Sequence, residues 1–389
     1  MNGKKLDVLY VSSWYPNKVK PLLGIFFKRH AAALAEVCNM ATLYVYADEN
    51  ESIEESDEDG VYTVRVGYKR ISSSVPVISN LLKLRRYKSS WKKAIAIYEQ
   101  KKGRPDIVNL NAIMPAYMAA LYLKRKWKIP YVITEQWTGY FPSDGRYKRL
   151  FIKSATQRAV KNASAVITVS HDLKTQMLKM GLENRYYVIS NIVDTEVFNI
   201  PKLKAKTDKI SFIHVSVLDD TQKNISGIIK VFQKLHTAFP GTEFTIVGNG
   251  VDRASLEDLS KSLGLTDSVH FVGQKEQYDL AGLLQKADAF VLFSNYETQA
   301  IVLLEALCCG IPVIATRAGG ISEYVTDKNG ILIDAKSDEQ LYDAMVSIVQ
   351  NRDRFGNASD LRASVLNKVN AKTIANQFLE VYNKVLNRS

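Results

Sequence analysis

The stretch ADAFVLFSNYETQAIVLLEALCCGIPVIA, residues 287–315, decides the fold class because it has the pattern of one strand–helix–strand unit. Phe290–Phe293 is short and wholly apolar, as expected of a buried parallel strand. Gln299–Cys309 is long and apolar enough for a buried helix, and Pro312–Ala315 is a second short apolar run. Repeated units of this kind build a parallel sheet covered by helices.

Two glutamates in this unit stand where apolar or turn residues would be expected. Glu297 is predicted to lie in the turn at the carboxyl end of the strand, just before a helix whose free N–H groups favour an anion. Glu305 is predicted to lie about two turns into the helix among apolar neighbours, where an unpaired carboxylate is costly. Its partner could be the adjacent hydroxyls of a ribose or a structural lysine or arginine, and both alternatives stay open.

Strand and helix patterns alternate along the whole chain in two series. The predicted strands of the first series are Leu6–Ser12, Ala41–Tyr46, Val61–Val66, Asp106–Leu110, Tyr131–Thr134, Ala165–Val169 and Tyr186–Ile189. Those of the second series are Ile210–Val217, Glu243–Val247, Val269–Val272, Ala289–Phe293, Pro312–Ala315 and Gly330–Ile333. A polar, lysine-rich stretch, Ile200–Asp208, separates them and is predicted to be a linker. We therefore expect two doubly wound α/β domains, residues 1–200 and 201–372, with a ligand cleft at the carboxyl ends of their strands.

The charge of the chain is placed unevenly. Residues 1–200 hold 31 Lys and Arg against 18 Asp and Glu, whereas residues 201–389 hold 21 and 22. The first half is therefore expected to meet something anionic: a membrane surface, a phosphorylated substrate or nucleic acid. The sequence contains no run of about 18 apolar residues, so we expect no membrane-spanning helix. Three cysteines form neither a disulfide framework nor a metal motif, which favours reduced thiols in a cytoplasmic protein.

Glycines mark further ligand candidates. Gly248 and Gly250 end a predicted strand, and glycine there lets a ligand approach the backbone closely. Gly24 lies in a loop before a predicted helix, which offers a second anion site across the cleft. The acidic run Asp48–Asp59 is expected to be a solvated loop, and the D-x-D match that it contains is expected to bind no metal.

Together these segments resemble the retaining glycosyltransferases of family 4, which have the GT-B fold. The most specific part is Glu297-x7-Glu305, followed by residues 306–315 and 319–323. The resemblance extends through residues 190–198, 246–250, 271–273 and 287–294. It implies two Rossmann-like domains facing each other across a cleft, an acceptor-binding first domain and a donor-binding second domain. It also implies a C-terminal helix, about residues 373–389, that returns to the first domain.

The resemblance further implies a hexosyltransferase-type reaction with a UDP- or GDP-sugar donor, without a metal or other cofactor. The donor-binding residues that it implies are Gly24, Lys223, Gly248, Gly250, Gln299, Ala300, Ile301 and Glu305. In such enzymes the carboxylate matching Glu305 binds the donor ribose, and the one matching Glu297 lies by the sugar and supports the reaction. Lys223 matches the lysine that binds the donor phosphate. The leaving phosphate itself is thought to take the acceptor proton.

Three positions depart from the family pattern. The usual arginine ahead of the lysine is replaced by Val217 or Leu218, so one cation for the diphosphate is missing or comes from elsewhere. Gln299 stands where a glycine is usual, and Gln136 stands where relatives often have a histidine. We assign Gln136 to the catalytic site as a residue that can hydrogen-bond a sugar hydroxyl but cannot take a proton.

Two segments are candidates for the acceptor side. Trp137 and Tyr140 either stack on an acceptor sugar or fill the interdomain wall. The predicted helix Ser79–Lys101 carries an aromatic stripe, expected to pack on the sheet, and a basic face that favours an anionic membrane or acceptor. Nucleic acid is not an expected partner, because the basic residues are spread through several helices.

The function predicted from the sequence is sugar transfer to a glycan or a lipid-linked acceptor in cell-surface polysaccharide biosynthesis. The expected location is cytoplasmic, with peripheral attachment to the inner face of the membrane. Two alternatives remain: an NDP-sugar epimerase of related fold, and a nonenzymatic subunit that binds sugar nucleotides.

Overall fold

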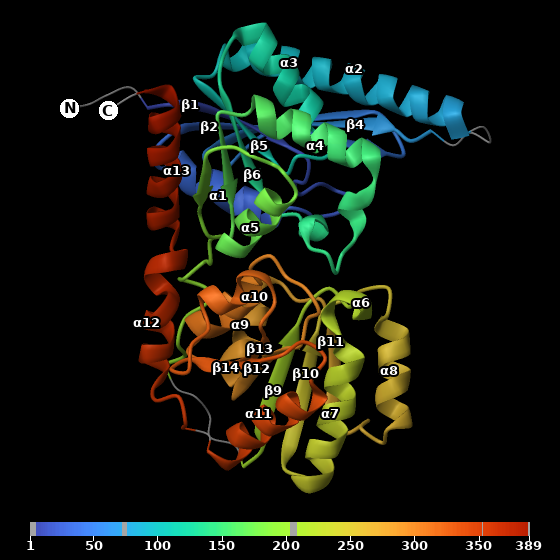
Figure 1. Ribbon diagram of the computed structural model, residues 1–389, viewed down its shortest axis with the longest axis vertical. Coiled ribbons are helices and arrows are strands. Elements are labelled where there is room, and N and C mark those ends of the chain that lie inside the picture. Colours follow the sequence, from blue (N-terminus) through green and yellow to red (C-terminus); the bar gives the residue numbers. More distant parts are fainter. Residues whose placement is uncertain (1–4, 72–75, 203–207, 352, 388–389) are drawn as a thin grey trace.

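The computed structural model describes residues 5–71, 76–202, 208–351 and 353–387. Within these residues the chain forms two α/β domains, one above the other in Figure 1. The strands of the first domain are β1 Asp7–Ser12, β2 Asn39–Asp48, β3 Ser52–Glu58, β4 Val61–Lys69, β5 Ile107–Asn111, β6 Tyr131–Glu135, β7 Ala165–Thr168 and β8 Tyr186–Val188. Their order in the sheet is β3-β4-β2-β1-β5-β6-β7-β8, and neighbouring strands are parallel except for β3 and β4.

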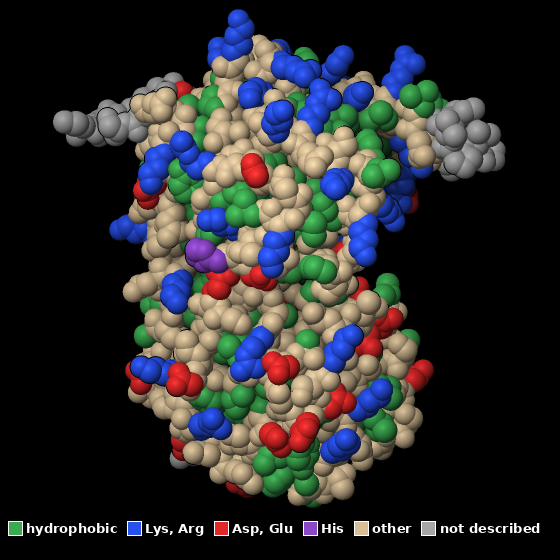
Figure 2. Space-filling model, in the orientation of Figure 1, with side chains coloured by type: hydrophobic (Ala, Val, Ile, Leu, Met, Phe, Trp, Pro, Cys, Tyr) green, Lys and Arg blue, Asp and Glu red, His purple; other side chains and the backbone are tan. Residues whose placement is uncertain are grey.

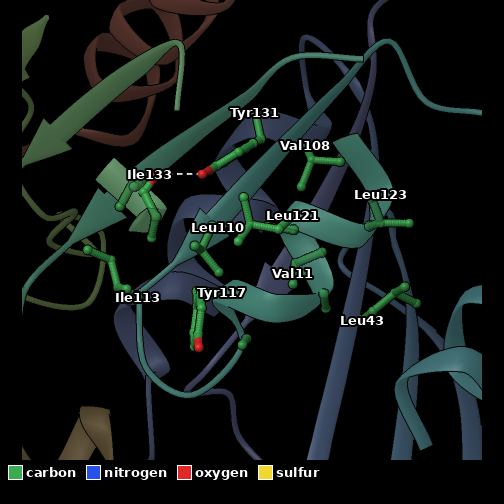
Figure 3. Close-up of a cluster of buried hydrophobic side chains, with 14 of the residues drawn as sticks. Val11, Leu43, Val108, Leu110, Ile113, Tyr117, Leu121, Leu123, Tyr131 and Ile133 are labelled. Atoms are coloured by element: carbon green, nitrogen blue, oxygen red, sulfur yellow. Dashed lines mark hydrogen bonds between the residues drawn. The ribbon is translucent and has the colours of Figure 1, made fainter. Parts of the chain in front are cut away.

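Helices cover both faces of the first sheet. They are α1 Ile25–Ala35, α2 Pro76–Lys102, α3 Tyr117–Trp127, α4 Leu150–Asn162 and α5 His171–Lys179. Helices α2 to α5 share one buried cluster with the sheet, part of which Figure 3 shows, with Leu110, Leu121 and Tyr131 among its members. The other face is covered by α1 and by the last helix, α13 Ala371–Leu386.

The second domain repeats this design. Its strands are β9 Ile210–Val215, β10 Thr242–Val247, β11 Val269–Gly273, β12 Ala289–Leu292, β13 Val313–Thr316 and β14 Gly330–Ile333. All pairs in this sheet are parallel, in the order β11-β10-β9-β12-β13-β14. Its helices are α6 Asp220–Lys223, α7 Ile225–Ala238, α8 Arg253–Ser262, α9 Gln277–Lys286, α10 Ile301–Cys308, α11 Asp338–Gln350 and α12 Ala358–Val369. The predicted class, two doubly wound α/β domains, is confirmed.

The C-terminal segment crosses from one domain to the other. Helices α12 and α13 form one column along the side of the molecule (Figure 1), in which α12 packs on α10 and α13 packs on α1. Ile374, Phe378 and Tyr382 of α13 are buried against the first domain. The predicted return of the C-terminal helix is therefore confirmed. Most of the predicted linker, residues 203–207, lies outside the described residues.

The acidic run at Asp48–Asp59 is the one segment where the sequence prediction of a loop is wrong. Most of it forms β3, an edge strand paired antiparallel with β4, and Asp48 ends β2. The turn between them consists of Asp59 and Gly60, both with positive φ, which is the geometry of a tight hairpin. Arg65 of β4 donates to Glu54 (3.0 Å) and Glu58 (3.2 Å), so the charge that favoured a loop is neutralised across the hairpin.

No helix in the described ranges is long and apolar enough to cross a bilayer.

Candidate active site

A cavity of about 930 Å³ lies between the two domains. It is bounded by the loops that follow β1 and β6 in the first domain and by those that follow β9 and β12 in the second. The sequence-predicted residues that line it are Gly24, Gln136, Trp137, Lys223, Glu297, Gln299, Ala300 and Ile301. Residues far apart in sequence converge here because parallel strands present their carboxyl ends at one edge of each sheet.

Glu297 occupies the turn between β12 and α10, as predicted. The Ser294 hydroxyl donates to Glu297 Oε1 (2.9 Å), and the Lys223 ammonium forms an ion pair with the same carboxylate. Both members of the pair are largely buried at the cavity wall. Gly319, at φ 57°, lies against the Glu297 backbone so closely that a Cβ at residue 319 would collide with the Glu297 carbonyl. Only glycine fits this position, so the glycine pair at 319–320 supports the turn that carries Glu297.

Lys223 lies at the end of the short helix α6, directly opposite Glu297. Asp219 caps α6 by accepting a hydrogen bond from the Gln222 N–H (3.3 Å). Val217, on the preceding loop, also lines the cavity and is 67% exposed, so this position of the loop supplies no cation. In the structure the lysine and the glutamate satisfy each other, and an anionic ligand would compete with Glu297 for Lys223.

Glu305 faces the gap between the domains but does not line the cavity. It is 4% exposed, and the Arg29 guanidinium of α1 donates to Glu305 Oε1 across the gap (3.0 Å). Burial raises the pKa of the Glu305 carboxyl, and the charge of Arg29 opposes that rise. Of the two partners left open by the sequence, the structure contains the cation, supplied by the other domain. Ribose binding by Glu305 stays a prediction.

A buried network of side-chain amides joins the two domains beside the cavity. Gln299 Oε1 accepts from both the backbone N–H (2.9 Å) and the side chain (2.8 Å) of Asn191, and its Nε2 donates to Ser190 and Tyr324. The amides of Asn191 and Gln136 exchange two further hydrogen bonds, both 2.9 Å. Every donor and acceptor site of the Gln299 amide is thereby used. This explains how the chain accommodates the Gln299 side chain at a buried position.

The segment Gln136–Trp137 is held by a carboxylate that sequence reasoning missed. Glu135, the last residue of β6, accepts hydrogen bonds from the N–H groups of Gln136 (2.8 Å) and Trp137 (3.0 Å). The Tyr140 hydroxyl also donates to Glu135 (3.1 Å), and this side chain is fully buried. Tyr140 therefore fills the wall, whereas Trp137 lines the cavity with the Arg146 guanidinium 5.5 Å from its ring centroid.

The remaining glycine predictions divide into two groups. Gly24 (φ 68°) is the N-cap residue just before α1 and lines the cavity, and a Cβ there would collide with the Trp14 backbone. Gly248 and Gly250 lie outside the residues that line the cavity. They let the loop after β10 pack directly on the loop after β9, because a Cβ at either position would collide with a carbonyl of that loop. Their contact with a donor stays a prediction.

Two further contacts close the domains on each other. The Glu323 carboxylate, in the 3-10 helix Gly319–Glu323, accepts hydrogen bonds from the N–H groups of His171 and Asp172 at the start of α5 (both 3.1 Å). Gly320 packs against Ser170 with no room for a side chain. The sequence did not predict the interdomain contacts of Arg29, Asn191 and Glu323, because the partners of these residues are on the other domain.

Among the described residues, no group of three or more His, Cys, Asp and Glu side chains is arranged to hold a metal ion. Metal-independent chemistry stays a prediction.

Comparison with known proteins agrees with this geometry. The model of "Glycosyltransferase Family 4" matches residues 27–197, and the model of "Glycosyl transferases group 1" matches residues 195–362. The chain belongs to this glycosyltransferase family. The two matches meet at residues 195–197, between the two sheets, so each model describes one domain of the enzyme family.

Curated relatives include two from bacilli. The N-acetyl-alpha-D-glucosaminyl L-malate synthase of Bacillus anthracis is 27% identical over 238 residues, which cover 58% of this chain and 61% of that protein. The chain thus matches less than two thirds of that relative's length. The putative teichuronic acid biosynthesis glycosyltransferase TuaC of Bacillus subtilis is 24% identical over 87% of this chain and 88% of its own length.

Solved glycosyltransferase structures share the whole architecture. The sucrose-phosphate synthase of Thermosynechococcus elongatus superposes with a TM-score of 0.80 at 19% identity, covering 98% of this chain and all of the other. Anabaena HepE in complex with UDP and glucose superposes with a TM-score of 0.74 at 18% identity, covering 97% and 99%. At these identities the likeness concerns the fold, which is GT-B, as the sequence predicted.

Proposed function

We propose that this glycosyltransferase transfers a sugar, with retention, from a nucleotide-sugar donor to a glycan or lipid-linked acceptor of a cell-surface polysaccharide. The observation that carries the proposal is the facing pair Lys223 and Glu297 at the wall of a 930 Å³ interdomain cavity, beside the start of α10. Family membership supports transfer, the UDP bound by HepE supports the donor class, and the full-length match to TuaC supports the acceptor class.

Donor binding begins with an exchange of partners at Lys223. The diphosphate carries more negative charge than a carboxylate and draws the ammonium away from Glu297. Backbone N–H groups at residues 299–301, at the positive end of α10, add to this site. The cation absent at Val217 is replaced from the first domain by Lys20, which lines the same cavity and whose ammonium has no hydrogen-bond partner in the described part of the chain. Arg146, which also lines the cavity, is instead engaged by Asp144.

Glu297, released from Lys223, then lies beside the sugar. Its charge stabilises the positive, oxocarbenium-like sugar of the transition state, while Lys223 stabilises the leaving diphosphate. The Gln136 amide, held by Asn191, retains one N–H and one lone pair for a sugar hydroxyl. The leaving phosphate accepts the proton of the acceptor hydroxyl, so no separate protein base is required. Closure of the domains around the donor and acceptor would exclude water, which otherwise hydrolyses the donor.

The cavity disfavours an epimerase. Such an enzyme needs an acid–base pair, and among the described residues the first-domain lining contains no Asp, Glu or His. A subunit that binds sugar nucleotides without turnover is the alternative that the exposed Val217 and the amide-bonded Gln136 leave open.

Nucleotide release from a panel of UDP- and GDP-sugars separates these functions. We expect one donor to be hydrolysed slowly without acceptor and faster with a matching acceptor, and Glu297→Gln to slow both reactions about 100-fold or more. Thermal stabilisation by a nucleotide with no release under either condition would instead establish the binding subunit. The product anomer, determined by NMR, tests retention.

A further inference from the structure

The helical layer on one face of the first domain has an unusual charge. Helices α2, α3 and α4 together hold fourteen Lys and Arg and a single acidic residue, Glu99. Glu99 is itself neutralised by Lys126 and by the Trp127 indole N–H. Figure 2 shows the contrast on one side of the molecule: Lys and Arg outnumber Asp and Glu over the first domain, whereas both signs mix over the second. This layer is therefore complementary to an extended anionic surface.

Large apolar side chains are exposed among these cations. On α2, Leu81 is 68% exposed, and Leu82 and Leu84 are also exposed. At the start of α4, Leu150 is 84% and Phe151 67% exposed. Single exposed apolar residues are ordinary, but here they come in two runs of sequence neighbours, one on α2 and one on α4, and the run on α2 also contains Lys83. A basic helix face that also exposes leucines is the composition of a helix lying on a membrane surface.

A small apolar cavity continues this surface between α2 and α3. It has a volume of about 170 Å³ and is lined by Trp91, Ile95 and Met118, together with the stems of Lys88 and Lys92. Tyr87, Trp91 and Ile95 of the aromatic stripe line it and pack on the sheet as the sequence predicted, whereas Leu84, on the same side of the helix, is 38% exposed. An apolar slot flanked by ammonium groups suits a molecule with an acyl chain and an anionic headgroup.

We infer that the outer face of α2 and α4, with the slot between α2 and α3, docks on an anionic phospholipid bilayer. A bilayer uses both features, because its headgroups pair with the cations and its interface buries the leucines and Phe151. Nucleic acid or another soluble polyanion would use the cations alone. A second copy of the chain would bring two such basic faces together, and their repulsion opposes that contact.

The docking surface is joined directly to the proposed active site. The chain passes from Thr138 and Arg146, which line the cleft, into the exposed start of α4 at Leu150. A docked enzyme would therefore hold its cleft mouth near the bilayer, where a lipid-linked acceptor presents its sugar. This last step rests on the proposed function, whereas bilayer docking itself does not.

Vesicle cosedimentation without donor or acceptor tests the docking. Vesicles of 30% phosphatidylglycerol in phosphatidylcholine should bind the protein at low salt, and pure phosphatidylcholine should not. Lys83→Gln with Lys88→Gln should weaken binding about 25-fold, or about fivefold for each charge removed. Leu81→Ser with Leu82→Ser should weaken it about tenfold or more. The control pairs Lys230→Gln with Lys234→Gln on α7, and Val251→Ser with Tyr278→Ser, are exposed on the second domain and should bind like the wild type.

Two results with vesicles would overturn the inference: no binding to anionic vesicles, or equal binding to neutral and anionic vesicles. A third would do so by showing that charge alone decides binding: leucine variants that bind like the wild type, together with binding to the soluble polyanion dextran sulfate as tight as to vesicles. All substituted side chains are exposed, so the folded far-UV circular dichroism spectrum should be kept. The vesicle assay contains no sugar donor, so it is independent of the nucleotide-release assay. Failure of bilayer docking can therefore be distinguished from failure of the proposed function.

Discussion

The Arg29–Glu305 pair joins the domains, and Arg29→Met should be costly. Glu305 is 4% exposed, so the substitution leaves a buried carboxylate without its cation. Removing one partner of a buried pair costs about 3–5 kcal/mol. For a domain of 150–250 residues, 3 kcal/mol lowers the melting midpoint by roughly 6–12 °C. Adding Glu305→Gln to the Arg29→Met variant removes the unpaired buried charge and should recover most of the lost stability.

The pH dependence of Arg29→Met has a definite sign. Burial already raises the pKa of Glu305 in the folded state, and loss of Arg29 removes the charge that opposes the rise. The folded variant then binds a proton that the unfolded chain releases near pH 4.5, so its stability falls as pH rises through the raised pKa. The deficit relative to wild type should be smallest near pH 4.5 and largest at neutral pH.

Differential scanning calorimetry from pH 4.5 to 8 measures both effects. The matched control is Arg317→Met, which removes the cation of an exposed pair with Asp334 (3.1 Å) and should cost less than about 1 kcal/mol. The reasoning is refuted if Arg29→Met is no less stable than this control at pH 8, or if Glu305→Gln adds a further loss instead of a rescue.

Two further substitutions test the supports of the site. Gln299→Ala removes four hydrogen bonds from a buried interdomain network. The free energy of unfolding, measured by urea titration, should fall by roughly 2–4 kcal/mol, and the KM for the donor should rise. Unchanged stability and KM would contradict the network's role. Gly319→Ala should lower kcat and stability together because its Cβ meets the Glu297 carbonyl, whereas Gly181→Ala, also at positive φ but in open space, should cost only about 1–2 kcal/mol with unchanged kcat. Equal effects of the two glycine changes would show that backbone conformation alone matters at Gly319.

The fold was predictable because its central strands are buried. A parallel strand covered on both faces must be a short apolar run, and such runs recur at the spacing of strand–helix units in both halves. The exception is β3, because its acidic composition is typical of a solvated loop. Only the structure shows that Arg65 of the neighbouring strand pairs with these acids. The Asp59–Gly60 turn was a usable signal for that hairpin, since this dipeptide favours the positive φ values that it adopts.

The site was predictable only within each domain. Glu297 and Lys223 converge because both follow strands of one parallel sheet. The carboxyl ends of such strands meet at one edge, so this proximity can be predicted once the strands are identified in the sequence. The partner of Glu305 depends on how the domains close, and Arg29 lies 276 residues away. The pairing of Gln299 with Asn191 has the same cause, since the segment after β8 meets the segment before α10 only in the closed molecule.

Nucleotide affinity and turnover of Lys223→Met and Glu297→Gln test the central claim most directly. Titration calorimetry with UDP and GDP should show that Lys223→Met weakens binding of the preferred nucleotide by about tenfold or more, because a charge-assisted contact is lost. Glu297→Gln should bind that nucleotide at least as tightly as wild type, since Lys223 is no longer shared, but should lose about 100-fold or more in sugar release. Wild-type affinity and turnover in both variants would contradict the assignment of this pair.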